Sequence, residues 1–188
     1  MLIIGITGTI GAGKGTIVEY LQKKLGFLHF SVRSFLTEEI HRRNMPLNRD
    51  SMVEVANELR AMHAPWHIVE QLYLQARQSG KNCIIESIRT PGEVEMLRKK
   101  ENFYLFAVDA EPQIRYTRIQ GRMNETDNIT YATFLENEKR EMASDDPNKQ
   151  NILKCVEMAD FRINNNNGLN ELFEQLDQIL KKIEHGRK

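Results

Sequence analysis

The chain has 188 residues, which is enough for one domain with a full core and too few for a multidomain machine. Its 26 basic and 26 acidic residues give a formal net charge of zero, so no global positive field attracts a nucleic-acid backbone, and small anionic ligands are favoured as partners. The two cysteines, Cys83 and Cys155, lie far apart without metal-ligand spacing, which argues against a zinc site and suits a reducing compartment.

An apolar run over residues 2–6 leads directly into a glycine-rich segment. The four glycines of residues 8–16 allow successive backbone N–H groups to curl around an anion, and apolar residues at helical spacing follow. The N-terminus of that helix favours the same negative charge. This order of strand, loop and helix predicts a loop that binds the phosphates of ATP, with Lys14 against the β and γ phosphates. The predicted ATP-binding residues of the loop are Gly8, Gly11, Ala12, Gly13, Lys14, Gly15 and Thr16.

The position after the lysine departs from the strict form of this loop. That form places Ser or Thr directly after the lysine as a magnesium ligand, whereas here Gly15 intervenes and Thr16 carries the hydroxyl. We therefore expect ATP with Mg²⁺, and we expect the ion to be held mainly through water, with Thr16 nearer a phosphate oxygen.

Short β runs alternate with longer helical patterns along the chain. We predict strands near residues 2–7, 27–30, 82–86, 103–109 and 160–163, with helices between and after them. This rhythm indicates an α/β fold with three layers, in which a five-stranded parallel sheet is covered by helices on both faces. No run approaches the roughly 20 apolar residues that span a bilayer, and the first apolar run has no basic leader, so we expect a cytoplasmic protein without a membrane partner.

The stretch between strands two and three, about residues 31–80, interrupts this alternation and is a candidate moving part. Ser31 and Arg33 directly follow strand two, where an acceptor would enter. Further along, Ser51 precedes a glutamate by three residues, a capping-box spacing that predicts a helix beginning there. Pro65 has the place of the first residue of the next helix.

Strand three ends with an acid, and an arginine follows closely. In open α/β sheets ligands collect beyond the carboxyl ends of the strands. Glu86 stands at the tip of strand three and Arg89 three residues on, so we expect both in the acceptor site. Glu86 is a candidate to hold Mg²⁺ through a water, and Arg89 to grip an acceptor phosphate. The alternative is a surface carboxylate with a nearby ion-pair partner.

The helix after strand four leads into a second interrupting stretch, about residues 121–151. Arg118 and Arg122 are i, i+4 neighbours on one face of that helix, at the entrance to the stretch. The stretch is highly charged and poor in apolar residues, so we expect it to pack lightly over the site as a short lid. It carries Arg140, a further candidate to stabilise the transferred charge.

With these motifs the chain resembles the P-loop nucleoside monophosphate kinases, related to dephospho-coenzyme A kinases and small archaeal-type nucleotide kinases. Residues 11–16, Gly-Ala-Gly-Lys-Gly-Thr, are similar to the adenylate-kinase form of the loop. Residues 118–122 resemble the Arg-x-x-x-Arg that begins the lid of that family, and residues 86–90 are similar to its acid and arginine-threonine after strand three. Residues 159–165 resemble the last strand and adenine-side loop of dephospho-coenzyme A kinases, which implies that Asn164 contacts ATP.

The resemblance implies a single P-loop kinase domain over residues 1–188, with an acceptor-binding region and a short lid in the two interrupting stretches. Our hypothesis is in-line transfer of the γ-phosphoryl group of ATP to the phosphate of a nucleoside or deoxynucleoside monophosphate. Lys14 and magnesium would hold the donor. The residues assigned to the moving charge are Arg118, Arg122 and Arg140, and those assigned to the acceptor are Ser31, Arg33, Glu86 and Arg89.

Two other functions stay open. A dephospho-coenzyme A kinase needs a base for a sugar hydroxyl, and residues 31–33 stand where that family carries an aspartate. A regulatory P-loop switch would hydrolyse nucleotide without any acceptor. The acceptor region also departs from the monophosphate kinases, since Arg33 and Ser34 replace a Gly-Asp pair and Thr37 replaces an arginine. We expect a small-molecule phosphate acceptor as partner and a monomer or homodimer.

Overall fold

The structure, a computed structural model, describes residues 1–100, 102–121 and 129–186. Within these residues five strands form one sheet in the order β2-β3-β1-β4-β5, and all neighbouring strands run parallel. The strands are β1 (Ile3–Thr7), β2 (Leu28–Ser31), β3 (Cys83–Glu86), β4 (Phe103–Asp109) and β5 (Phe161–Asn164). The five predicted strands and their parallel arrangement are confirmed, with bounds that differ by one residue at most.

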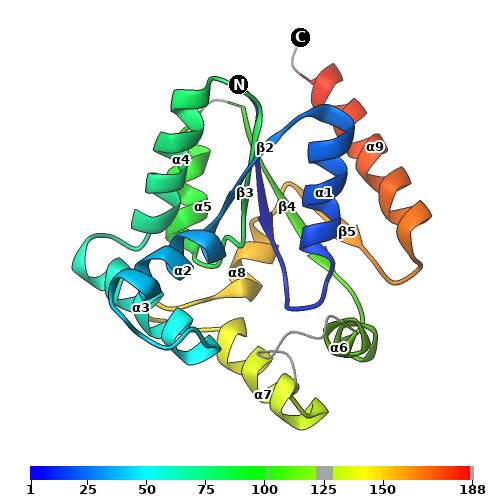
Figure 1. The fold of residues 1–188 in the computed structure, drawn as a ribbon. Coiled ribbons are helices and arrows are strands. Elements are labelled where there is room, and N and C mark those ends of the chain that lie inside the picture. Colours follow the sequence, from blue (N-terminus) through cyan, green and yellow to red (C-terminus); the bar gives the residue numbers. More distant parts are fainter. Residues whose placement is uncertain (101, 122–128, 187–188) are drawn as a thin grey trace.

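Helices cover both faces of the sheet, as the alternation of strands and helices predicts (Figure 1). The helices of the described residues are α1 (Lys14–Leu25), α2 (Val32–Arg42), α3 (Arg49–Met62), α4 (His67–Ser79), α5 (Pro91–Arg98), α6 (Pro112–Gln120), α7 (Tyr131–Met142), α8 (Ile152–Glu157) and α9 (Leu169–His185). One face is covered by α1 and α9, and the other by α4, α5 and α8, with α2 and α3 continuing the second layer beyond the end of β2.

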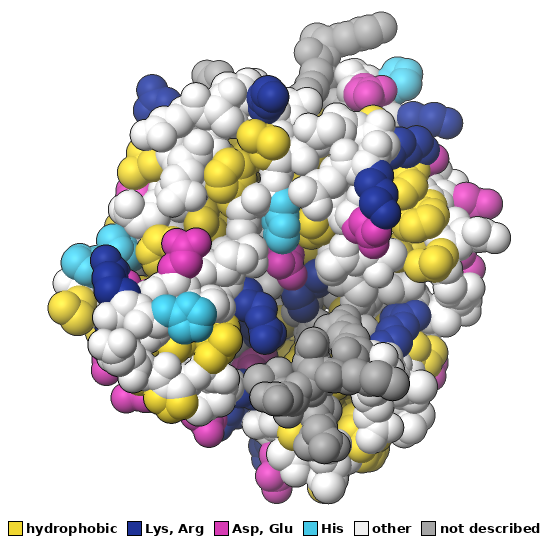
Figure 2. All heavy atoms as spheres, in the orientation of Figure 1, with side chains coloured by type: hydrophobic (Ala, Val, Ile, Leu, Met, Phe, Trp, Pro, Cys, Tyr) yellow, Lys and Arg dark blue, Asp and Glu magenta, His cyan; other side chains and the backbone are white. Residues whose placement is uncertain are grey.

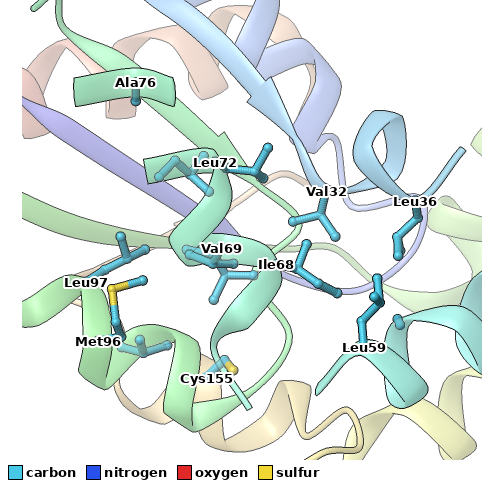
Figure 3. Packing of buried hydrophobic residues seen from close by; sticks show 14 of the residues in the cluster. Val32, Leu36, Leu59, Ile68, Val69, Leu72, Ala76, Met96, Leu97 and Cys155 are labelled. Atoms are coloured by element: carbon cyan, nitrogen blue, oxygen red, sulfur yellow. The ribbon is translucent and has the colours of Figure 1, made fainter. Parts of the chain in front are cut away.

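The two layers each bury one set of strand side chains, because successive residues of a strand point to opposite faces. In β1, Ile4 and Ile6 pack with the helices α1 and α9, whereas Ile3 packs with α4 and α5 on the other face. Figure 3 shows this second cluster, where Ile68 and Val69 of α4 lie between the side chains of α2 and those of α5. The three-layer α/β/α fold follows from this alternation.

The strand register brings three strand ends together at one edge of the sheet. Ile6 of β1 pairs with Glu86 of β3, and Ser31 of β2 pairs with the same residue from the other side. The segments that follow these strands therefore start side by side: the glycine-rich loop after β1, α2 after β2 and residues 87–90 after β3. This edge is where the sequence places its site.

The starts of two helices differ from the prediction. The helix expected from Ser51 begins at Arg49, because the side chain of Asn48 accepts a hydrogen bond from the Ser51 backbone N–H and so caps the helix three residues earlier. Pro65 precedes its helix and is not its first residue, since α4 begins at His67.

The described part of the second interrupting stretch, residues 129–151, packs against the fold through buried side chains of α7, which corrects our expectation of light packing. Within α7, Phe134 is fully buried and Glu141 is 5% exposed. The Phe134 ring lies 5.4 Å from the guanidinium carbon of Arg115, a buried cation on α6. The stretch is poor in apolar residues, but the Phe134 ring and two ion-paired carboxylates, Glu138 and Glu141, hold α7 against the fold. Among the described residues, no helix combines the length and the apolar character that a membrane crossing requires.

Candidate active site

A cavity of about 500 Å³ lies at the edge where β1, β2 and β3 end. Its wall combines the loop after β1 and the start of α1 with α2, α3, the residues after β3 and one side chain of α7. In Figure 2 basic side chains gather near the middle of the face shown, next to a carboxylate and a histidine. The cavity therefore joins the predicted phosphate loop to the stretch predicted to bind an acceptor.

The glycine-rich loop is held in a conformation that needs glycine. Gly13 has a φ of 104°, and a Cβ there would lie 2.2 Å from the side-chain nitrogen of Asn165. That nitrogen donates to the Ala12 carbonyl over 2.8 Å, so the residue after β5 closes over the loop. Lys14 Nζ donates to the carbonyls of Gly8 and Thr9, at 2.9 and 2.8 Å. The ammonium thus lies folded along the loop, at the wall of the cavity.

Glu86 faces this loop from the tip of β3. It lines the cavity, its Oε2 lies 3.4 Å from His29 Nε2, and its Oε1 accepts a hydrogen bond from the Ser87 hydroxyl over 3.1 Å. Burial disfavours the charged carboxylate, but His29 and Lys14 outweigh it and lower the pKa of Glu86 below its ordinary value. Ser87 has a φ of 73°, so the chain turns sharply directly after the acid.

The cavity offers few oxygen ligands for a metal ion. Thr16 and Glu86 both line it, and His29 and Lys14 favour the ionised form of Glu86 by lowering its pKa. In the described part of the chain no group of three or more His, Cys, Asp or Glu side chains is arranged to hold a metal. These residues fit an ion such as Mg²⁺ that keeps several waters and binds mainly to substrate phosphates, as the sequence leads us to expect.

Three arginines outside the glycine-rich loop and α1, Arg33, Arg49 and Arg89, line the cavity beside the buried Arg60. Arg89 donates from Nη1 to Glu141 Oε2 over 2.6 Å and to Gln150 Oε1 over 2.9 Å. Arg49, at the start of α3, donates to the other oxygen of Glu141. Arg33 lines the cavity from α2 and is exposed. The sequence prediction includes Arg33 and Arg89 but misses Arg49, whose place was obscured by the expectation that the helix begins at Ser51.

Arg115 is a second residue that the prediction does not single out. It is 3% exposed, and its Nη1 lies 2.6 Å from Glu138 Oε1 and 3.3 Å from the Ile10 carbonyl in the phosphate loop. It therefore joins α7 to the loop. The signal was present in the sequence, because Arg115 lies four residues before the buried Ile119 and shares its inward face of α6.

The residue that contacts the phosphate loop is shifted by one position from the predicted adenine-side residue. Asn164, the predicted ATP contact, is exposed and accepts from the Asn166 N–H, whereas Asn165 is 4% exposed and touches the loop at Ala12. Adjacent residues at a strand end point to opposite sides, which explains the shift. Arg118 Nη2 donates to the Asn165 carbonyl over 2.8 Å, so this arginine does lie at the loop. Arg122 lies outside the described residues.

Six of the predicted site residues that the structure describes do not line the cavity: Gly8, Ala12, Ser31, Arg118, Arg140 and Asn164. Arg140 contacts Asp50 over 3.3 Å with half of its side chain exposed, because consecutive residues of a helix point about 100° apart and Glu141 takes the inward position. Ser31 caps α2, where its hydroxyl accepts a hydrogen bond from the Ser34 N–H. Both assignments are therefore corrected: Arg140 lies at the surface beside α3, and Ser31 has a structural role.

Lowering the pH is expected to weaken the contact of α7 with the rest of the fold. Burial opposes ionisation of Glu141, but Arg89 and Arg49 outweigh it and lower the pKa of this carboxyl below its ordinary value of 4.5. The folded pKa is below the unfolded one, so the stabilisation is complete above the unfolded pKa and is lost as pH falls through the folded pKa.

The measurement is the thermal midpoint of the wild type and of Glu141→Gln from about pH 6 to about pH 3. The variant is expected to lose less stability over this range, and Glu136→Gln, an exposed position on the same helix, should follow the wild type. An equal acid loss in wild type and Glu141→Gln would contradict this account.

Comparison with known proteins extends over nearly the whole chain. The model of a family described as an AAA domain matches residues 4–144. A UPF0200 protein of Methanocaldococcus jannaschii is 30% identical over 186 residues, covering 97% of this chain and 91% of the relative. A UPF0200 protein of Methanococcus maripaludis strain S2 is 28% identical, covering 97% and 98%.

Solved structures show the same fold at low sequence identity. Shikimate kinase from Bacteroides thetaiotaomicron is 14% identical with a TM-score of 0.53, covering 97% of this chain and 98% of that one. An uncharacterized protein from Eubacterium ventriosum is 14% identical with a TM-score of 0.59, covering 98% and 99%. The predicted P-loop kinase fold is thereby confirmed, and identities this low carry no information about substrate.

Proposed function

The chain belongs to the AAA-domain family, and from this premise we propose that it is an ATP-dependent phosphotransferase acting on a nucleoside or deoxynucleoside monophosphate. One observation carries the proposal: the same cavity is lined by Lys14 of the phosphate loop and by Arg33, Arg49 and Arg89 from α2, α3 and the segment after β3. A donor phosphate chain and an acceptor phosphate could then meet inside it. The likeness of fold to shikimate kinase supports a small-molecule phosphotransferase in general.

On the donor side, Lys14 would leave the carbonyls of Gly8 and Thr9 for the β and γ phosphates, which the loop N–H groups surround. Thr16 and Glu86 would hold magnesium, largely through water, and the bound ion would neutralise charge on the phosphates. Arg118, which contacts the loop through Asn165, would lie near the base or the transferred group. Arg122 would stabilise the transferred charge, as the sequence predicts.

On the acceptor side, positive charge exceeds negative charge. Glu141 compensates one of the two arginines that it bridges, and Arg33 adds a further cation. Arg49 also has a buried Nε with no hydrogen-bond partner among the described residues. A buried cation without full compensation is costly, so this end of the cavity favours a group with two negative charges such as a phosphate monoester.

The proposed step needs no base. An oxygen of the acceptor phosphate attacks the γ phosphorus in line, the bond to the β–γ bridging oxygen breaks, and the electron pair leaves with ADP. The protein would supply positioning and positive charge. Residues 31–80 would form the acceptor-binding region and residues 121–151 the lid, joined to the phosphate loop through Arg115.

The test is ADP formation from ATP and Mg²⁺ across a panel of ribo- and deoxynucleoside monophosphates, with dephospho-coenzyme A, shikimate and a no-acceptor control. We expect turnover that depends on one or a few monophosphates and product with one phosphate more. Turnover with dephospho-coenzyme A or shikimate alone would replace the acceptor with one that offers a hydroxyl. Equal phosphate release with and without acceptors would instead make the protein a hydrolysing switch.

A further inference from the structure

One face of α3 forms a wall of the cavity, and beyond Arg49 the phosphate-transfer step does not use it. Its cavity-lining residues are spaced at helical intervals, with cations at the two ends and apolar side chains between them: Arg49, Met52, Val53, Ala56 and Arg60. The two arginines are separated by about 16 Å along the helix axis. Val32 and Leu36 of α2 line the cavity as well. The arrangement fits an elongated ligand with a charged end, an apolar body and a polar far end.

Arg60, at the far end of this face, is 1% exposed and forms an ion pair with the fully buried Glu93. Its Nε and Nη2 donate to Glu93 Oε1 at 3.2 and 2.9 Å. The second oxygen of Glu93 accepts the backbone N–H groups of Arg89 and Thr90, at 2.8 and 3.1 Å. Both oxygens of the carboxylate are therefore occupied.

The third nitrogen of the Arg60 guanidinium, Nη1, takes no part in the bonds to Glu93. This nitrogen is buried and has no hydrogen-bond partner among the described residues. Glu93 engages the opposite edge of the guanidinium and does not line the cavity, whereas Arg60 does. Buried N–H donors in folded proteins are nearly always paired, so an unpaired one at a cavity wall indicates a partner supplied by a ligand.

Charge and space define that partner. Arg60 and Glu93 neutralise each other, so a second anion at this end would have no cation to compensate it. The Arg60 side chain is almost wholly enclosed, so the plane of its guanidinium is not open for a ring to stack on it. An arginine donates and never accepts. The matching group is therefore a single neutral oxygen acceptor, such as the carbonyl oxygen of a ring.

We infer that Arg60 determines base specificity: its Nη1 donates to the exocyclic carbonyl oxygen of a nucleobase whose ring lies between Val32, Leu36 and the apolar face of α3. The inference rests on the proposed function, since the acceptor phosphate must lie at the Arg49 and Arg89 end. The acceptor is then a nucleoside monophosphate whose base is guanine, uracil, thymine or cytosine, because each of these bases has an exocyclic carbonyl oxygen. Adenine has no exocyclic carbonyl and is disfavoured.

The experiment compares Arg60→Lys with wild type on the best monophosphate of the panel. A lysine ammonium keeps the pairing with Glu93 but is too short to replace Nη1. We expect KM for the acceptor to rise about 10- to 100-fold, with kcat changed far less, since one hydrogen bond to a charged donor is lost. Arg43→Lys is the matched control, because Arg43 is also ion-paired, with Glu39 and Glu58, but lies outside the cavity.

A second comparison needs no variant. Wild type is assayed with a nucleotide in which the base carbonyl is replaced by hydrogen, such as 2-aminopurine riboside monophosphate against GMP, and the same rise in KM is expected. Turnover with AMP as the best acceptor, or equal KM for the two nucleotides, would overturn the inference and leave the proposed function standing. Turnover with no monophosphate at all would overturn both.

Discussion

Replacing Lys14 with alanine is expected to lower acceptor-dependent ADP formation by about 10²- to 10³-fold, the cost of removing one charged group from a preorganised phosphate site. Its Nζ already lies on the phosphate loop, bound to the carbonyls of Gly8 and Thr9. The fold should survive the change, because Lys14 is only partly buried and the two carbonyls can turn to water in the cavity.

The measurements are initial rates of ADP formation and the thermal midpoint of each variant. Lys23→Ala is the matched control, since Lys23 lies on the same helix with 76% of its side chain exposed and pairs with Glu19. It should behave as wild type in both assays. If Lys14→Ala keeps more than about a tenth of the wild-type rate, the loop is not the donor site and the proposed function fails.

Replacing Glu93 with alanine is expected to lower the free energy of unfolding by about 3–5 kcal/mol, the largest stability effect predicted for this protein. Glu93 is fully buried and accepts hydrogen bonds from Arg60 and from the backbone N–H groups of Arg89 and Thr90. Its loss would leave the Arg60 guanidinium uncompensated in the interior and two buried donors unpaired. Such a loss can exceed half of the total stability of a domain.

Urea or guanidinium unfolding of Glu93→Ala, Glu93→Gln and Glu95→Ala separates this cause from a general effect of changing α5. Glu95 is exposed on the same helix, and its removal should change stability by no more than about 0.5 kcal/mol. Glutamine can still accept hydrogen bonds, so its variant should fall between the other two. A Glu93→Ala variant as stable as Glu95→Ala would mean that the ion pair contributes nothing.

The elements with a strong local pattern were the ones that the sequence could predict. The β runs of four to seven residues locate all five strands, because apolar runs between turns have few other solutions in a sheet covered on both faces. The loop around Lys14 was recognisable because its glycines and lysine are adjacent in the chain. Glu86 was found by the same reasoning, since it ends a strand that neighbours the loop.

The misses all depend on which way a side chain points on a helix or at a strand end. Arg140 and Glu141 are adjacent, and the residue that faces the cavity is the acid. Asn164 is exposed, whereas the adjacent Asn165 is buried against the phosphate loop. Arg49 was missed because the helix starts earlier than its capping-box spacing suggested. Moving by one residue points the side chain to the opposite face of a strand, or about 100° around a helix. An error of one residue in an element's position therefore changes which side chains face the site.

The sequence by itself determined the order of strands and helices, the glycine-rich loop and the edge of the sheet where the cavity lies, since each of these follows from local patterns at the strands and their ends. Only the tertiary structure decided what surrounds that loop: Arg115 joining it to α7, Glu141 bridging Arg49 and Arg89, and Arg60 held by Glu93. These partners are separated by 23 to 92 residues in the chain, as the contact of Glu138 with Arg115 and that of Glu141 with Arg49 show. No local spacing encodes such pairs, because they are selected by how the helices pack once buried charges must find compensation.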